Sequence, residues 1–338
     1  MKQFYYVIFC LFVSIVFNTC KTDFDVTAPY RETTVVYGLL NIADTIQWVR
    51  INKAFLGDEN AYTMAQHPDS INYPDILDVK LEEYAESGAF VKTLNLVRDS
   101  SIAKEPGIFA VSPNILYRTN GIDTLDEDNE YKLVIYNRET GKTITAKTKV
   151  IGSIYMIYPL INAPSFQIAW YKQNTLTVKW TTVPEAVDYQ LTIRFHYDEV
   201  NIADTTDVQA KYIDWTFPDQ VISGTTNSQS QQIQPIAKDG FYNFVKSQVA
   251  PNVNVKRIIG PLDFIIGAAA YEFYTYIQVN KPPSGVNQNI PQYTNVDGGL
   301  GIFSSRLRQN YPGYIMDIES KDSLMHGIIT GDLQFKLF

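Results

Sequence analysis

Short segments in which apolar and polar side chains alternate recur along this chain, and they constrain its fold more than any other feature. The segment Ile46–Phe55 shows the alternation clearly, and Thr33–Leu40 before it is rich in β-branched and aromatic residues. A period of two is typical of strands that bury one face. The short turn Asn41–Asp44 between the two segments predicts a β-hairpin.

The rest of the first 150 residues continues this pattern. Strands are predicted at Asp78–Tyr84, Val91–Val97 and Thr143–Val150, because each is rich in strand-forming residues and bounded by turn residues. The segment Leu56–Asp75 contains glycine, asparagine, histidine and two prolines without periodicity, so it is predicted to form a long loop.

A leucine and a tyrosine six residues apart give the most diagnostic signal in this region. Leu125 precedes Tyr131, which opens the alternating run Tyr131–Ile135. The spacing resembles the tyrosine corner of immunoglobulin-like and fibronectin type III sandwiches, in which the tyrosine hydroxyl bonds to upstream backbone. The first region is therefore predicted to be a β-sandwich.

A second β pattern begins beyond residue 153. Leu176–Trp180 alternates, a bend that contains proline follows, and Tyr189–Phe195 alternates again. This order resembles strands B and C of a fibronectin type III module. In such a module Trp180 would be the buried ring of the core, and Tyr189 would be a structural residue of the next strand.

Helical signals appear in the second half of the chain. Apolar residues in Asp239–Val249 recur at helical spacing, and a strand is predicted at Leu262–Ile266. Ala268–Val279 is ambiguous, because its alanines favour a helix and its aromatic residues favour a strand; we predict a helix. The predicted fold is mainly β, with an immunoglobulin-like sandwich over residues 28–152 and a fibronectin III-like sandwich over residues 153–338. Short helices and a C-terminal extension elaborate the second sandwich.

The first twenty residues predict export and lipidation. Lys2 precedes the apolar run Phe4–Phe17, which is too short to span a membrane and matches the apolar core of a secretory signal. Cys20 follows small polar residues, so residues 1–19 are predicted to be a lipoprotein signal peptide and Cys20 to be lipidated. The alternative is an ordinary signal cleaved nearby, which would leave Cys20 as a free thiol.

The residues that follow Cys20 indicate where in the cell envelope the protein lies. Asp23 and Asp25, in the predicted acidic tether of residues 20–27, resemble the acidic export signal of surface lipoproteins of Bacteroidota. The resemblance implies a lipid-anchored protein of the outer membrane that is exposed on the cell surface. A solvated tether on a protein that faces the periplasm is the alternative.

Charge and cysteine content narrow the possible functions and the possible sources of stability. Removal of residues 1–19 takes away one basic residue and no acidic one, which leaves 27 basic and 36 acidic residues and a net charge of −9. This balance gives no electrostatic footprint for nucleic acid. Cys10 lies within the predicted signal, so no disulfide is expected in the mature chain and its fold must depend on the core.

Three internal segments and the leader are together similar to uncharacterised cell-envelope lipoproteins of Bacteroidota. The segments are Val36–Asn41, Arg50–Phe55 and Thr294–Arg306. The resemblance implies an N-terminal immunoglobulin-like region and no catalytic residues. The run Gly298–Gly301 does not match a dinucleotide-binding loop, so it is interpreted as a tight turn into a strand at Ile302–Arg306.

No sequence pattern predicts catalysis, a metal site or a cofactor. His67, His196 and His326 are far apart and lack ligand spacing. The acidic residues within 123–128 lack the central glycine of a calcium loop and are interpreted as a solvated turn.

The leading hypothesis is therefore a non-catalytic binding or adaptor subunit that docks on another outer-membrane protein. The alternative is a surface glycan-binding lipoprotein that supports nutrient uptake, because Tyr271, Tyr274, Tyr276 and Tyr293 would stack on sugar faces if their rings were exposed. We expect these four rings to be buried, which would argue against glycan binding.

Overall fold

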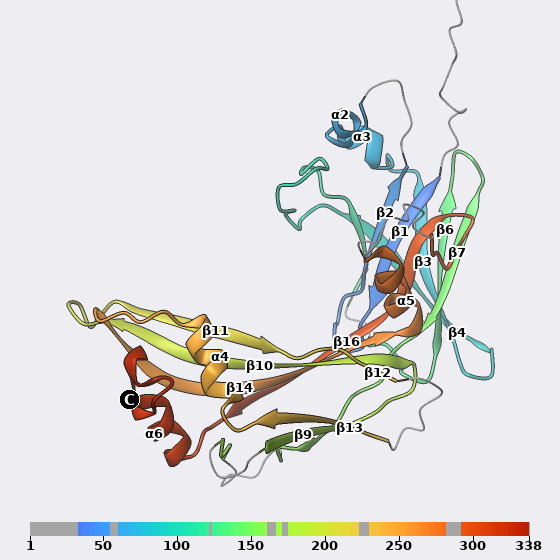
Figure 1. Ribbon diagram of the computed structural model, residues 1–338. Coiled ribbons are helices and arrows are strands. Elements are labelled where there is room, and N and C mark those ends of the chain that lie inside the picture. Colours follow the sequence, from blue (N-terminus) through green and yellow to red (C-terminus); the bar gives the residue numbers. More distant parts are fainter. Residues whose placement is uncertain are drawn as a thin grey trace, which may run out of the picture.

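One long strand connects the two halves of this molecule. The computed structural model describes residues 33–54, 60–121, 124–160, 167–170, 175–222, 230–281 and 292–337, and these are mainly β, as predicted. Figure 1 shows two arms that meet at an angle, and β16 (Leu300–Tyr314) runs from one arm into the other. β1 (Thr34–Leu40) pairs with β16 in parallel, so strands from both ends of the sequence share one large mixed sheet.

The first arm contains the strands that alternation predicted. The predicted hairpin of β1 and β2 is confirmed, and β3 pairs with both β4 and β6. The row of strands ends at β15, which leads directly into β16 beside β1, so the sheet curls around its core. The other strands of this arm are β2 (Trp48–Lys53), β3 (Leu77–Tyr84), β4 (Phe90–Asp99), β5 (Leu116–Thr119), β6 (Glu130–Asn137), β7 (Thr143–Lys149) and β15 (Val296–Asp297).

Part of the segment Leu56–Asp75 is helical, and the prediction of a loop there was wrong. The side chain of Asn60 caps α2 (Ala61–Ala65) by accepting a hydrogen bond from its second residue, and α3 (Pro68–Ile71) has proline in its first turn. Helices of five and four residues are too short to show a helical period, so the pattern could not reveal them.

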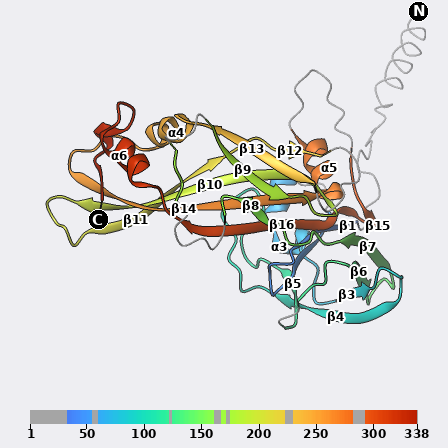
Figure 2. The same ribbon diagram turned by 90° about the horizontal axis from the view of Figure 1, so that it is seen from below.

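The second arm consists of two sheets packed face to face. Figure 2 shows β9 and β13 lying over β10 and β14. The smaller sheet has the order β13-β9-β8, and β11, β10, β14 and β16 form the larger one, with β12 paired to β10. The strands of this arm are β8 (Met156–Tyr158), β9 (Thr175–Thr181), β10 (Ala186–Asn201), β11 (Val208–Thr216), β12 (Gln220–Val221), β13 (Gln231–Ala237) and β14 (Val255–Ala270).

Both predicted helices of the second half are confirmed, as α4 (Gly240–Gln248) and α5 (Tyr271–Asn280). β14 and β16 are longer than the strands predicted inside them. In β16 every residue of 301–305 is buried, so its centre carries no alternation to detect. The C-terminal extension adds α6 (Ile318–His326), the 3-10 helix η1 (Gly331–Leu333) and β17 (Phe335–Lys336), which pairs with β14.

The buried apolar side chains form two clusters, one in each arm. The first draws on residues 36–150 together with Val296 and Phe303, and the second draws on residues 151–335. β16 supplies Phe303 to the first cluster and Leu307 and Tyr311 to the second. Two separate sandwiches in series are therefore not confirmed, because a single strand belongs to both arms.

Candidate functional site

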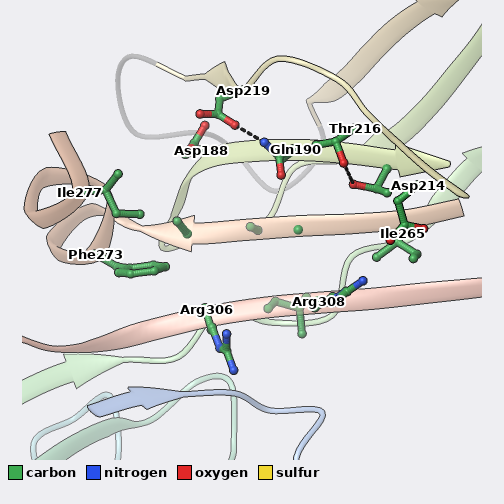
Figure 3. A pocket seen from close by; sticks show the side chains of 15 residues that line it. Asp188, Gln190, Asp214, Thr216, Asp219, Ile265, Phe273, Ile277, Arg306 and Arg308 are labelled. Carbon is green, nitrogen blue, oxygen red and sulfur yellow. Dashed lines mark hydrogen bonds between the residues drawn. The ribbon is translucent and has the colours of Figure 1, made fainter. Parts of the chain in front are cut away.

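A cleft of about 510 Å³ lies on the outer face of the second arm, close to the angle between the arms (Figure 3). Residues of β10 and β14 alternate between the core and this face: Leu191, Ile193 and Phe264 are buried in the core, whereas Gln190 and Thr192 line the cleft. β10, β11, β14 and β16 form its floor and sides, and α5 covers one end. The cleft therefore lies where elements from distant parts of the sequence meet.

Part of the floor of the cleft is open because β14 carries three small residues in succession there, beyond Ile265. Gly267, Ala268 and Ala269 follow one another. Among the described residues other than its chain neighbours, a Cβ placed on Gly267 would meet only the backbone oxygen of Gln190, at 3.7 Å. Neighbouring strands lie about 4.8 Å apart, so side chains of β10 and β16 flank this floor from about 10 Å apart. The space between them is open to a ligand or to a partner's side chain.

Two arginines of β16 form one side of the cleft. Arg306 and Arg308 are two residues apart on a strand, so both point to the outer face, and both are exposed. Within the part of the chain that the structure describes, neither guanidinium forms an ion pair. A guanidinium binds carboxylate, sulfate or phosphate groups through paired hydrogen bonds. This side of the cleft is thus suited to an anionic group.

Carboxylates form the opposite side. Asp219 accepts a hydrogen bond of 2.6 Å from the side chain of Gln190. Oδ1 of Asp188 is buried and has no hydrogen-bond partner among the described residues. Burial, together with the charge of Asp219, raises the pKa of Asp188 above its ordinary value. Asp188 is thus an acceptor that a donor group of a ligand would satisfy.

Charged and aromatic groups continue along the outer face beyond the cleft. Arg194 pairs with both oxygens of Asp214, at 2.7 and 2.8 Å, and its guanidinium lies 3.9 Å from the ring centre of Tyr212. Hydrogen bonding from Arg194 lowers the pKa of Asp214, and the charge of Arg308 adds to this effect. The outer face therefore remains ionised and ordered along β10 and β11.

The four tyrosines proposed for sugar stacking all lie near α5, but other residues of the helix line the cleft. Phe273 and Ile277, one turn apart, are the side chains that α5 contributes to it. The expectation of burial was wrong for Tyr271, which is 60% exposed. The other three, Tyr274, Tyr276 and Tyr293, are half-buried.

Tyr276 links α5 to the first arm. Its ring meets that of Tyr37 on β1 edge to face, with 6.2 Å between centres. Burial, with a hydrogen bond to Tyr37, raises the pKa of Tyr276 to about 12. This contact fixes α5 in the angle between the arms, so Tyr276 supports the cleft rather than facing into it.

The predicted structural residues lie in the two cores. The hydroxyl of Tyr131 accepts a hydrogen bond of 2.6 Å from Asp126 N, and Leu125 is buried beside it. Tyr189 repeats this contact in the second arm, because its hydroxyl accepts a bond of 2.9 Å from Val183 N. Trp180 is fully buried and contacts the ring of Tyr189.

Three residues of the cleft were not predicted from the sequence, and three predicted residues lie outside the part of the chain that the structure describes. Arg306, Arg308 and Asp188 were not predicted, although the spacing of two between the arginines was a signal that they share a face. Cys20, Asp23 and Asp25 lie outside the described residues.

No protein-family model matches this chain, and no curated protein matches it. Within the described ranges, no group of three or more histidine, cysteine or acidic side chains could hold a metal ion. No helix in those ranges is long and apolar enough to cross a membrane.

Proposed function

We propose that this chain is a non-catalytic lipoprotein of the outer membrane that acts as a binding or adaptor subunit of a cell-envelope complex. The leader and Cys20 support attachment through lipid, and the acidic residues after Cys20 support exposure at the cell surface, with a periplasm-facing protein as the alternative. The two buried tyrosine corners support an origin of the arms in immunoglobulin-like and fibronectin III-like modules.

The observation that carries this proposal is the composition of the surface in the angle between the arms. It combines exposed Tyr37 and Tyr271 with Arg306 and Arg308 beside a cleft. Tyrosine and arginine are enriched in the small groups of residues that dominate the energy of protein interfaces. Because β1, α5 and β16 hold these side chains in place, the side chains offer a partner a preformed surface.

Co-purification tests the proposal. The tagged full chain is extracted from its own cells with mild detergent, either with its natural sequence or with Arg306→Glu and Arg308→Glu together. We expect a defined partner with the natural chain and its loss with the double variant. Lys142→Glu with Lys238→Glu makes the same change of charge on exposed residues that do not line the cleft and should retain the partner. Recovery of the protein alone, or equal recovery of a partner with both variants, would contradict the proposal.

The exposure of Tyr271 favours glycan binding as a second candidate function. An exposed ring offers a flat apolar face for a sugar, and the ring lies at the start of α5, beside the cleft. In electrophoresis through gels that contain a polysaccharide, Tyr271→Ala should abolish any retardation of the natural chain. Tyr155→Ala removes a similarly exposed ring from another surface and should change nothing.

A further inference from the structure

An apolar surface lies at the end of the first arm, away from the cleft. It belongs to a cap made of residues 60–73, which include α2 and α3, and of the loop 100–115 between β4 and β5. Tyr62 is 69% exposed, Ile108 58% and Phe109 48%, and Ile102 and Val111 are also exposed. Monomeric proteins seldom expose several large apolar side chains together unless the surface binds something.

Hydrogen bonds hold the two parts of the cap together. Ala110 N donates a 2.8 Å hydrogen bond to Ala65 O, which attaches the loop to the end of α2. The side chain of Gln66 donates to the carbonyl oxygens of Gly107 and Ile108, and Lys104 donates to Ala110 O while its ammonium lies over the ring of Phe109. These bonds fix the loop backbone while the side chains of Ile108 and Phe109 remain exposed.

The cap lies where the predicted lipid tether enters the fold. Tyr73, at its base, is hydrogen-bonded to Thr34, and Thr33 O accepts a bond from Ala54 N beside it. Figure 1 shows α2 and α3 at the end of the arm where β1 begins, whereas α6 lies at the far end of the other arm. The peptide steps from Cys20 to Thr33 span at most about 45 Å. A lipid on Cys20 would therefore hold Thr33, and with it the base of the cap, within this distance of the membrane surface.

We propose that this cap inserts its exposed apolar side chains into the lipid surface to which the chain is anchored. The inference rests on the proposed lipidation of Cys20, because the tether supplies the high local concentration that makes a weak contact effective. The cap contains Lys104 against Asp69 and Glu105. Its net charge is thus slightly negative, so it gains nothing from anionic lipids and is suited to a surface of neutral headgroups. The contact would orient the first arm with the cap against the membrane surface.

Quenching of a tryptophan tests this contact. The full lipidated chain is placed in phosphatidylcholine vesicles whose acyl chains are brominated, and the emission of the natural chain is subtracted from that of each variant. We expect the added emission of Phe109→Trp to be quenched several-fold more than that of Ile328→Trp, whose site is fully exposed on the other arm beyond α6. Equal quenching of the two variants would overturn the proposal. Loss of Phe109→Trp quenching when a protein recovered by co-purification is added back would also overturn it.

A second experiment tests the contact of the cap with lipid independently of the proposed lipidation of Cys20. Mass spectrometry of the mature chain shows whether Cys20 carries fatty acids. The chain from residue 21 onward, with an N-terminal histidine tag, is then held on phosphatidylcholine vesicles that contain a nickel-chelating lipid. Quenching of Phe109→Trp there supports the cap contact even if Cys20 proves unmodified, and its absence overturns the contact even if Cys20 is acylated. The chain from residue 21 onward without a tag has neither lipid nor tag to hold it on a vesicle. In this chain, Ile108→Ser with Phe109→Ser should lower the fraction that floats with phosphatidylcholine vesicles, compared with the unsubstituted chain.

Discussion

Tyr131 and Tyr189 play the same part at equivalent places in the two arms. Each hydroxyl accepts a hydrogen bond from the backbone N–H at a bend five or six residues upstream, and each ring is fully buried. The hydroxyl satisfies a backbone donor that enters the core at the bend. Desolvation raises the pKa of both phenols, so both stay protonated at neutral pH.

We expect Tyr131→Phe to lower the free energy of unfolding by about 1 kcal/mol, because the N–H of Asp126 would lose its partner while the ring remained packed. Urea denaturation followed by circular dichroism measures the change. Tyr136→Phe, on the exposed side of the same strand, is the matched control and should leave the midpoint unchanged. An identical midpoint for both variants would mean that the hydroxyl of Tyr131 contributes nothing.

Asp188 gives a prediction that depends on pH. Its pKa is raised above the ordinary value of 3.8, so the folded state favours the protonated form more than the unfolded state does. Stability from this group is therefore present below pH 3.8 and is lost as pH rises through the raised pKa. Asp188→Asn should then be more stable than the natural chain at pH 7 and equally stable at low pH. Asp207→Asn, at an exposed site, should show no such divergence in melting temperature.

At the scale of elements, the parallel pairing of β1 with β16 depends on glycine. Gly301 has φ of +102°, and a Cβ at this position would overlap the carbonyl oxygen of Val36 on the neighbouring strand. Gly299 is similarly restricted, because its Cβ would approach Thr34 O to 2.8 Å. The predicted tight turn at Gly298–Gly301 is thus also the place where two backbones come into close contact.

Gly301→Ala should lower the free energy of unfolding by more than about 3 kcal/mol, since strain at positive φ adds to a clash with backbone. Gly313→Ala is the matched control: φ there is +85°, but nothing lies within 4 Å of the added methyl group, so only about 1–2 kcal/mol should be lost. Thermal unfolding measures both. Equal losses would show that the close approach of the strands does not matter.

At the scale of the whole molecule, β16 makes the first arm dependent on residues near the C-terminus. A chain of residues 33–152 would lack Val296 and Phe303 of its core and would leave β1 with an open edge. We expect this fragment to aggregate or to melt well below the full chain. A second fragment joins residues 33–152 through a glycine-rich linker to residues 294–307, and it should recover cooperative unfolding. Calorimetry compares the two, and a stable shorter fragment would contradict the dependence.

The sequence by itself determined the mainly β class, the hairpin of β1 and β2, the helices α4 and α5, and the residues of the first tyrosine corner. These features arise from local patterns, because alternation, turn chemistry and short spacings are set by neighbouring residues. Only the tertiary structure decided that β16 joins β1, that Arg306 and Arg308 face Asp188 across β14, and that the cap lies beside the start of β1. Each of these joins segments tens to hundreds of residues apart, and no local period records which strands will be neighbours in a sheet.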